Sequence, residues 1–266
     1  MRRIGVLAGF VSMILAAGLL AGTAACSSKS PSPSSPSQSS QASGSIVVFA
    51  AASLKPAFTK ISQQFKTDNP GSGVDFDFGG SSDLATQLTQ GATADVFASA
   101  DTAQMDKVTK AGLLAGNPTN FASNTLVIVT AAGNPKQVGS FGDLGKPGLS
   151  VVICQRPVPC GAATQRLEDS TGVHLNPVSE ELNVTDVLNK ITTGQADAGL
   201  VYVTDARSAG DKVTTVNFPE AAGAVNVYPI GALKKAPQPM LAQKFVALVT
   251  SDTGQNILAQ FGFAKP

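Results

Sequence analysis

The sequence predicts an α/β protein with two lobes, built from short apolar strands that alternate with amphipathic helices. The first observation is the alternation itself: apolar runs such as 46–50 and 126–130 are followed by segments with helical spacing. This order is typical of α/β folds with mainly parallel strands. The second observation is size, because residues 46–266 hold more strand–helix units than one small sheet usually takes. We therefore expect one lobe from 46–124 with 225–266 and a second from 125–224, joined by two crossover strands.

Each element has its own pattern. Residues 74–78 alternate apolar and polar side chains, 126–130 are strongly β-branched, and 54–65 place four apolar side chains on one helical face. The full set of expected strands is 46–50, 74–78, 96–98, 126–130, 149–153, 200–203 and 225–230. The expected helices are 54–65, 83–89, 103–111, 162–170, 184–192 and 240–250.

The N-terminus is typical of an export signal. Arg2 and Arg3 precede an apolar run over 4–20, small residues occupy 23–25, and Cys26 follows. A cysteine at this position resembles the lipobox of bacterial lipoproteins, although Thr23 stands where that box prefers leucine. We expect a signal peptide at 1–25 and a lipid on Cys26; an ordinary secretory signal and a retained membrane helix are the alternatives.

Residues 26–45 predict a disordered tether. They are almost entirely Ser, Pro, Gln and Ala, and cannot bury enough apolar surface to offset the entropy of ordering. The expected location is therefore the extracytoplasmic face of the cell membrane, held through Cys26.

Composition excludes several kinds of partner. The chain has 19 basic and 18 acidic side chains, and without Arg2 and Arg3 the balance is 17 to 18. Such a chain has no basic field for nucleic acid. It has no Trp and two Tyr, which argues against a carbohydrate site. We expect a monomer without a cofactor or a directly bound metal.

Cys154 and Cys160 are six residues apart in a proline-containing segment. In an exported protein such a pair indicates a disulfide. The alternatives are two buried free thiols, or a metal site that would need further ligands.

Several expected helices begin directly after small or hydroxyl residues. This occurs after 50–53, 79–82, 159–161 and Asn183. A helix start exposes unpaired N–H groups and the positive end of its dipole. Several starts aimed at one cleft would hold an anion without Lys or Arg, although Ser and Asn at such positions are also ordinary helix caps.

The sequence motifs support an enzymatic function less well than a binding function. The Gly-x-Ser-x-Gly motif of serine hydrolases is absent, and the single histidine, His174, lies in an expected loop. A hydrolase using Ser53 is kept as the alternative from another functional class.

Seven segments, taken together and in order, are similar to the periplasmic molybdate-binding proteins of ABC transporters. The most specific are Ala-Ala-Ala-Ser-Leu at 50–54 and Ala-Asp-Val-Phe-Ala-Ser-Ala-Asp at 94–101. The full set is 48–54, 78–84, 91–101, 124–129, 158–161, 199–205 and 261–263.

This resemblance implies a two-lobed, hinged type II periplasmic binding protein that is not an enzyme. It implies an oxyanion ligand, molybdate or tungstate, delivered to an ABC transporter permease; sulfate or another oxyanion on the same fold is the alternative. The implied contacts are the hydroxyls of Ser53, Ser81 and Tyr202 and the backbone N–H groups of Cys160 and Val184. At the position of Cys160 the family usually has alanine.

Overall fold

The computed structural model describes residues 43–266 of the chain. The expected signal peptide at 1–25, the lipid site Cys26 and most of the tether at 26–45 lie outside the described residues. The end of the expected tether needs correction, because the first strand already begins at Gly44. Among residues 43–266, no helix is both long and apolar enough to span a bilayer.

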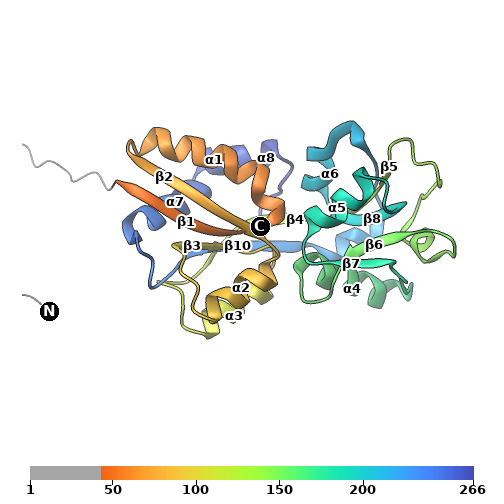
Figure 1. The fold of residues 1–266 in the computed structure, drawn as a ribbon, viewed down its shortest axis with the longest axis horizontal. Helices are drawn as coiled ribbons and strands as arrows, with labels where there is room; N and C mark the ends of the chain where they lie inside the picture. Colours follow the sequence, from red (N-terminus) through yellow and green to blue (C-terminus); the bar gives the residue numbers. More distant parts are fainter. Residues whose placement is uncertain (1–42) are drawn as a thin grey trace, which may run out of the picture. The chain divides into compact units, whose positions relative to one another are not determined.

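The fold contains two five-stranded sheets, each covered by helices (Figure 1). The first sheet has the strand order β2-β1-β3-β10-β4 and the second β7-β6-β8-β5-β9. The strands of the first sheet are β1 (Gly44–Ala51), β2 (Ser72–Gly79), β3 (Val96–Ala98), β4 (Thr119–Asn124) and β10 (Asn226–Ala232). Those of the second are β5 (Leu126–Ala131), β6 (Val151–Cys154), β7 (Ser179–Glu181), β8 (Ala198–Tyr202) and β9 (Val213–Val216).

Both sheets are mixed, but in each only one strand, β10 in the first and β5 in the second, runs against the others, so the expectation of mainly parallel strands is confirmed. Strand β1 pairs in parallel with β2 and β3, but β10 runs antiparallel to both β3 and β4. In the second sheet β6 is parallel to β7 and β8, whereas β5 is antiparallel to β8 and β9. The antiparallel pairs arise where the chain crosses between the sheets, because a strand that leaves one sheet and a strand that returns to it run in opposite directions.

Helices cover both faces of the first sheet, and each face has its own hydrophobic core. The first face packs Phe58, Phe245 and Ile257, and the second packs Leu84 and Met105. The helices of the first face are α1 (Lys55–Asp68), α7 (Pro239–Thr250) and α8 (Asp252–Gln260), and those of the second are α2 (Ser81–Thr89) and α3 (Thr102–Lys110). The second sheet packs with α4 (Pro159–Thr171), α5 (Val184–Thr192) and α6 (Val203–Ala209) around one core.

The sequence patterns missed five elements: β4, β7, β9, α6 and α8. The four-residue β9 and three-residue β7 are too short to show a hydrophobic period. Residues 200–203 were expected to be one strand, but β8 ends at Tyr202 and α6 begins at Val203.

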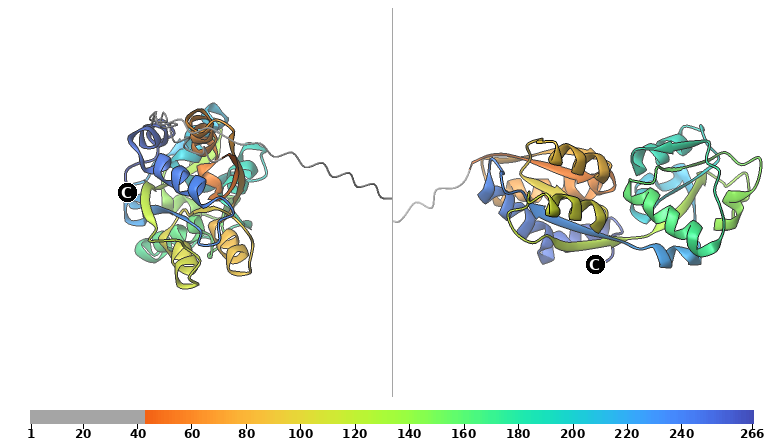
Figure 2. Two further views of the ribbon diagram at one scale, coloured as in Figure 1. Left: turned by 90° about the vertical axis from the view of Figure 1, so that its left-hand side faces the viewer. Right: turned by 90° about the horizontal axis from the view of Figure 1, so that it is seen from below.

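Two connections join the sheets. The chain leaves the first sheet through β4 into β5 and returns at the start of β10, where Asn226 pairs with Asn124. Figure 2 shows these connecting segments, which β4 and β10 bring side by side. The Asn124 side chain also donates to the Thr204 hydroxyl of α6, 2.8 Å away, so the first sheet and the second-sheet helices touch at this junction.

Candidate oxyanion site

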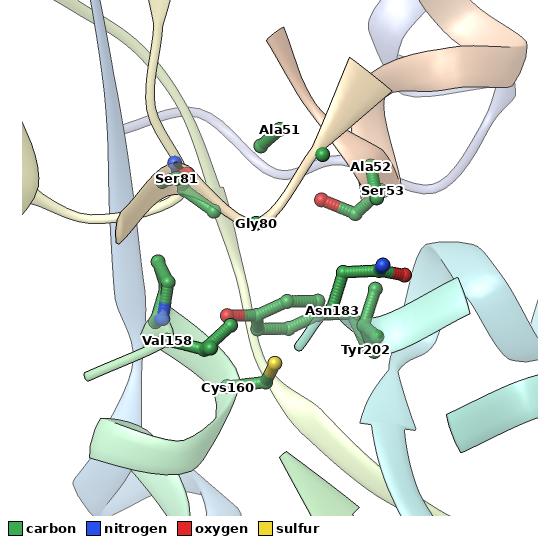
Figure 3. Close-up of a pocket in the computed structure, with 13 residues that line it drawn as sticks. Ala51, Ala52, Ser53, Gly80, Ser81, Val158, Cys160, Asn183 and Tyr202 are labelled. Carbon is green, nitrogen blue, oxygen red and sulfur yellow. Dashed lines mark hydrogen bonds between the residues drawn. The ribbon is translucent and has the colours of Figure 1, made fainter. Parts of the chain in front are cut away.

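One pocket brings together every residue that the sequence predicted as a ligand contact. Ser53 and Ser81 line it from the first-sheet side, and Cys160, Val184 and Tyr202 line it from the second-sheet side. Figure 3 shows Ser53 and Ser81 on one side of the pocket and Cys160 on the other, with the Tyr202 ring between the two sides. Segments more than 100 residues apart in sequence therefore converge on one small space.

Four helix starts face this pocket. The short 3₁₀ turn at Ala52–Leu54 that leads into α1, and the starts of α2, α4 and α5, all contribute lining residues. The first three have no side-chain cap, since Ala51, Gly80 and Val158 occupy the capping positions. At the fourth, Asn183 accepts only from the N–H of Asp186. First-turn N–H groups have no partner within a helix, so these starts offer donors to a ligand.

The serine hydroxyls are oriented by their neighbours. Ser81 Oγ accepts the Ala100 N–H at 3.0 Å, which leaves its own proton free for another acceptor. Ser53 Oγ lies 3.0 Å from the hydroxyl of Tyr228, and either atom can donate. If Tyr228 donates to Ser53, the Ser53 proton is free for the pocket as well. Both serines are buried, so these hydrogen bonds form away from bulk water.

Tyr202 supplies the third hydroxyl. Its side chain is 1% exposed, and its oxygen accepts a hydrogen bond from Asn226 Nδ2 at 2.7 Å. Burial is the main reason that the pKa of Tyr202 is raised well above its usual value, with Tyr228 and Asp101 adding to the effect. The phenol therefore stays protonated, as a donor to an anion must.

The electrostatic character of the pocket comes from dipoles. None of the described residues that line it carries a charged side chain. The nearby carboxyl of Asp205 is fully buried, and this burial raises its pKa to about 7 against the effect of the Tyr202 N–H that it accepts. At pH values below about 7, Asp205 is therefore mostly neutral and adds little negative charge beside an anion.

The two sides of the pocket touch at Gly80. A Cβ atom added to Gly80 would lie 2.2 Å from the backbone oxygen of Leu182, far closer than atoms can approach. Gln104 of α3 makes a second contact between the sides, because its Nε2 donates to the Pro157 oxygen at 2.7 Å. The structure is therefore a closed arrangement of the two lobes.

Cys154 and Cys160 form a disulfide in the structure. The bridge links the end of β6 to the first turn of α4, where Cys160 lines the pocket. The alternative, a metal site at these two cysteines, would need further ligands. Residues 43–266 contain no group of three or more His, Cys, Asp or Glu side chains placed to hold a metal ion.

Sequence reasoning missed two residues that shape this site, Asn226 and Tyr228. Asn226 and Tyr228 lie on β10, whose pattern indicates only a strand. Of the two most specific motifs, 94–101 contributes a single lining residue, Ala100. Its other polar members are structural: Asp95 accepts the N–H groups of Val47 and Gln238, and Asp101 caps α3.

The Ser53 hydrolase alternative gains no support from the geometry. The Ser53 hydroxyl contacts Tyr228, which is not a general base because burial raises its pKa above the usual value. His174 is exposed in the loop after α4, as expected from the sequence.

Known proteins are similar to this chain in sequence over most or all of its length. The family model described as "Bacterial extracellular solute-binding protein" matches residues 46–264. The molybdate-binding protein ModA of Mycobacterium tuberculosis is 68% identical over 266 residues, covering 100% of both chains. These relatives are solute-binding proteins and not enzymes.

Solved structures share the fold. The periplasmic molybdate-binding protein of Azotobacter vinelandii superposes with a TM-score of 0.73 at 21% identity, covering 83% of this chain and 99% of that one. The sulfate-binding protein SubI of Mycobacterium tuberculosis gives a TM-score of 0.73 at 19% identity, covering 84% and 87%. At these identities the likeness establishes the two-lobed periplasmic binding-protein fold alone.

Proposed function

Because the chain belongs to the bacterial extracellular solute-binding proteins, we propose that it captures molybdate outside the cell membrane and passes it to an ABC transporter permease. The observation that carries this proposal is the lining of the pocket. Four helix starts and three buried hydroxyls from both lobes converge there without any charged side chain. The 68% identity to a molybdate-binding protein supports the choice of ligand.

Uncharged donors suit a ligand that must be held and then released. The proposed contacts are the hydroxyls of Ser53, Ser81 and Tyr202 and the N–H groups of Cys160 and Val184. An arginine partner would add strong charge-assisted bonds and slow release. Donors at fixed positions select instead by size, because each must meet an oxygen of the anion.

Closure of the lobes completes the site. Ser53 and Ser81 belong to the first lobe, whereas Cys160, Val184 and Tyr202 belong to the second. An anion held by both sets stabilises the closed arrangement, and rotation about the 124–126 and 225–226 connections would open it. We infer that the permease receives the anion when these connections open the cleft.

Calorimetric titration of the domain 43–266 tests the ligand. Molybdate should bind, tungstate should bind equally or nearly so, and sulfate should bind far more weakly because its oxygens lie closer to the central atom. At about one hundred times its dissociation constant, molybdate should add roughly 2.7 kcal/mol to the free energy of unfolding. Tight binding of sulfate with no heat from molybdate would instead favour the alternative oxyanion.

We further propose that a lipid on Cys26 holds the protein at the membrane surface through the 26–45 tether. The support is the lipobox-like segment 23–26 after a short apolar run. Mass spectrometry of the N-terminal peptide from membrane-extracted protein should show a diacylglyceryl-modified Cys26. A free Cys26 thiol in a protein released into the soluble fraction would contradict the anchor.

The disulfide should tune binding without being essential for it. The bridge closes a short ring from Cys154 to Cys160 and so restrains the Cys160 N–H and the Pro157 oxygen that Gln104 contacts. Replacing both cysteines by alanine should weaken molybdate binding several-fold, since an alanine N–H can still donate. The free energy of unfolding should fall by roughly 2 kcal/mol from the loss of the ring. Chemical denaturation and titration of the double variant measure the two effects; unchanged affinity would make the bridge a purely structural link.

A further inference from the structure

Asn226 lies where the chain returns to the first lobe, and it contacts three parts of the site. It is the first residue of β10 and is 2% exposed. Its side chain is bonded to Arg166 and Pro159 of α4 and to the hydroxyl of Tyr202. No pattern in the sequence marks this residue.

The direction of the Asn226 amide is fixed from both ends. Arg166 Nη2 donates to Oδ1 at 2.6 Å, and Nδ2 donates to the Pro159 oxygen at 3.2 Å. A guanidinium can only donate and a carbonyl oxygen can only accept. The amide therefore cannot be reversed without breaking both bonds.

This fixed amide determines the role of the Tyr202 hydroxyl. Asn226 Nδ2 also donates to the Tyr202 oxygen, at 2.7 Å. A phenol has one proton, so a tyrosine that accepts from the amide must direct that proton to another acceptor. Tyr202 lines the pocket, where a bound oxyanion would offer an acceptor. A further polar neighbour is the Tyr228 hydroxyl, which is paired with Ser53.

We propose that Asn226, oriented by Arg166, is a positioning residue that makes the Tyr202 hydroxyl a donor toward the bound oxyanion. The inference rests on the proposed function. A fully deprotonated oxyanion has only acceptors to offer, so every hydroxyl of the site must point its proton inward. The chain from Arg166 through Asn226 to Tyr202 also polarises each successive donor, which strengthens the last bond.

A double-mutant cycle tests this chain with molybdate as the probe. Tyr202→Phe should raise the dissociation constant by about tenfold or more, the loss expected for one hydrogen bond to a charged group. Asn226→Ala should raise it by roughly three- to tenfold, since the Tyr202 proton is no longer directed. In the Tyr202→Phe background, Asn226→Ala should add less than about twofold, because the hydroxyl through which it acts is gone.

If Asn226 had only a structural role, Asn226→Ala would raise the dissociation constant by the same factor in the Tyr202→Phe background as in the wild type. The two factors would then multiply in the double variant. Additive effects, or wild-type affinity of Asn226→Ala, would overturn the inference while the proposed function stands. A wild-type domain that binds neither molybdate nor tungstate would overturn the proposed function itself.

Arg166→Met provides a second route if Asn226→Ala does not fold, because Arg166 is exposed on α4. It should weaken binding about two- to threefold in the wild type and have no effect in the Tyr202→Phe background. Arg156→Met is the matched control, since it removes the same charge from an exposed position in the nearby disulfide loop. Equal weakening by both arginine variants would indicate a general charge effect and overturn the orienting role of Arg166.

Discussion

Replacing Gly80 by alanine should weaken molybdate binding by roughly 5- to 150-fold, the equivalent of an overpacking cost of about 1–3 kcal/mol in the closed state. The added Cβ would lie 2.2 Å from the backbone oxygen of Leu182 in the opposite lobe. A backbone atom cannot move aside as easily as the end of a flexible side chain. The clash is absent when the lobes are apart, so the variant should favour the open form. Calorimetric titration measures the affinity, and small-angle X-ray scattering with and without molybdate measures closure.

Gly79→Ala is the matched control for this prediction. It adds the same methyl group one residue earlier, but its nearest neighbour is a Leu84 methyl at 3.5 Å, an ordinary contact. The Gly80 backbone has φ −65° and ψ 131°, which alanine adopts freely, so the unliganded Gly80→Ala domain should be as stable as the wild type. Equal affinities of the two variants would show that contact at Gly80 does not limit closure.

Ser53→Ala and Ser81→Ala should each weaken molybdate binding by about 10- to 150-fold, because each removes a buried hydrogen bond to a charged ligand worth roughly 1.5–3 kcal/mol. Ser81→Ala also leaves the Ala100 N–H without its present acceptor, so its stability should fall as well. Ser53→Ala removes the partner of Tyr228 but leaves that hydroxyl close to the pocket. Titration and thermal unfolding separate the loss of affinity from the loss of stability.

Ser82 offers a control within the same turn. Its Oγ is buried and has no hydrogen-bond partner among residues 43–266, and Ser82 is not part of the pocket lining. Ser82→Ala should therefore change the dissociation constant by less than about twofold and leave the protein as stable or slightly more so. A large effect at Ser82 with none at Ser81 would mean that the two serines have been assigned in the wrong order.

Local patterns were sufficient for most helices and strands. The α5 range 184–192 and the β3 range 96–98 agree with the structure residue for residue, because a clear helical period and a short buried run mark them. The short strands β7 and β9 could not be recognised, since their pairing partners, rather than their own residues, hold them in the sheet. The mixed direction of both sheets was likewise invisible, because strand direction depends on how the chain crosses between lobes.

The sequence by itself determined the α/β class, the family and the residues brought to the pocket, because helix-start residues and ordered motifs are local features. The tertiary structure decided how those residues work together. Only folding places the Leu182 oxygen against Gly80, Tyr228 beside Ser53, and Asn226 between Arg166 and Tyr202. These contacts join residues 24 to 175 positions apart, and long-range pairs of this kind leave no periodic trace in a single sequence. The direction in which each hydroxyl donates is therefore a property of the packed site and not of the motif that contains it.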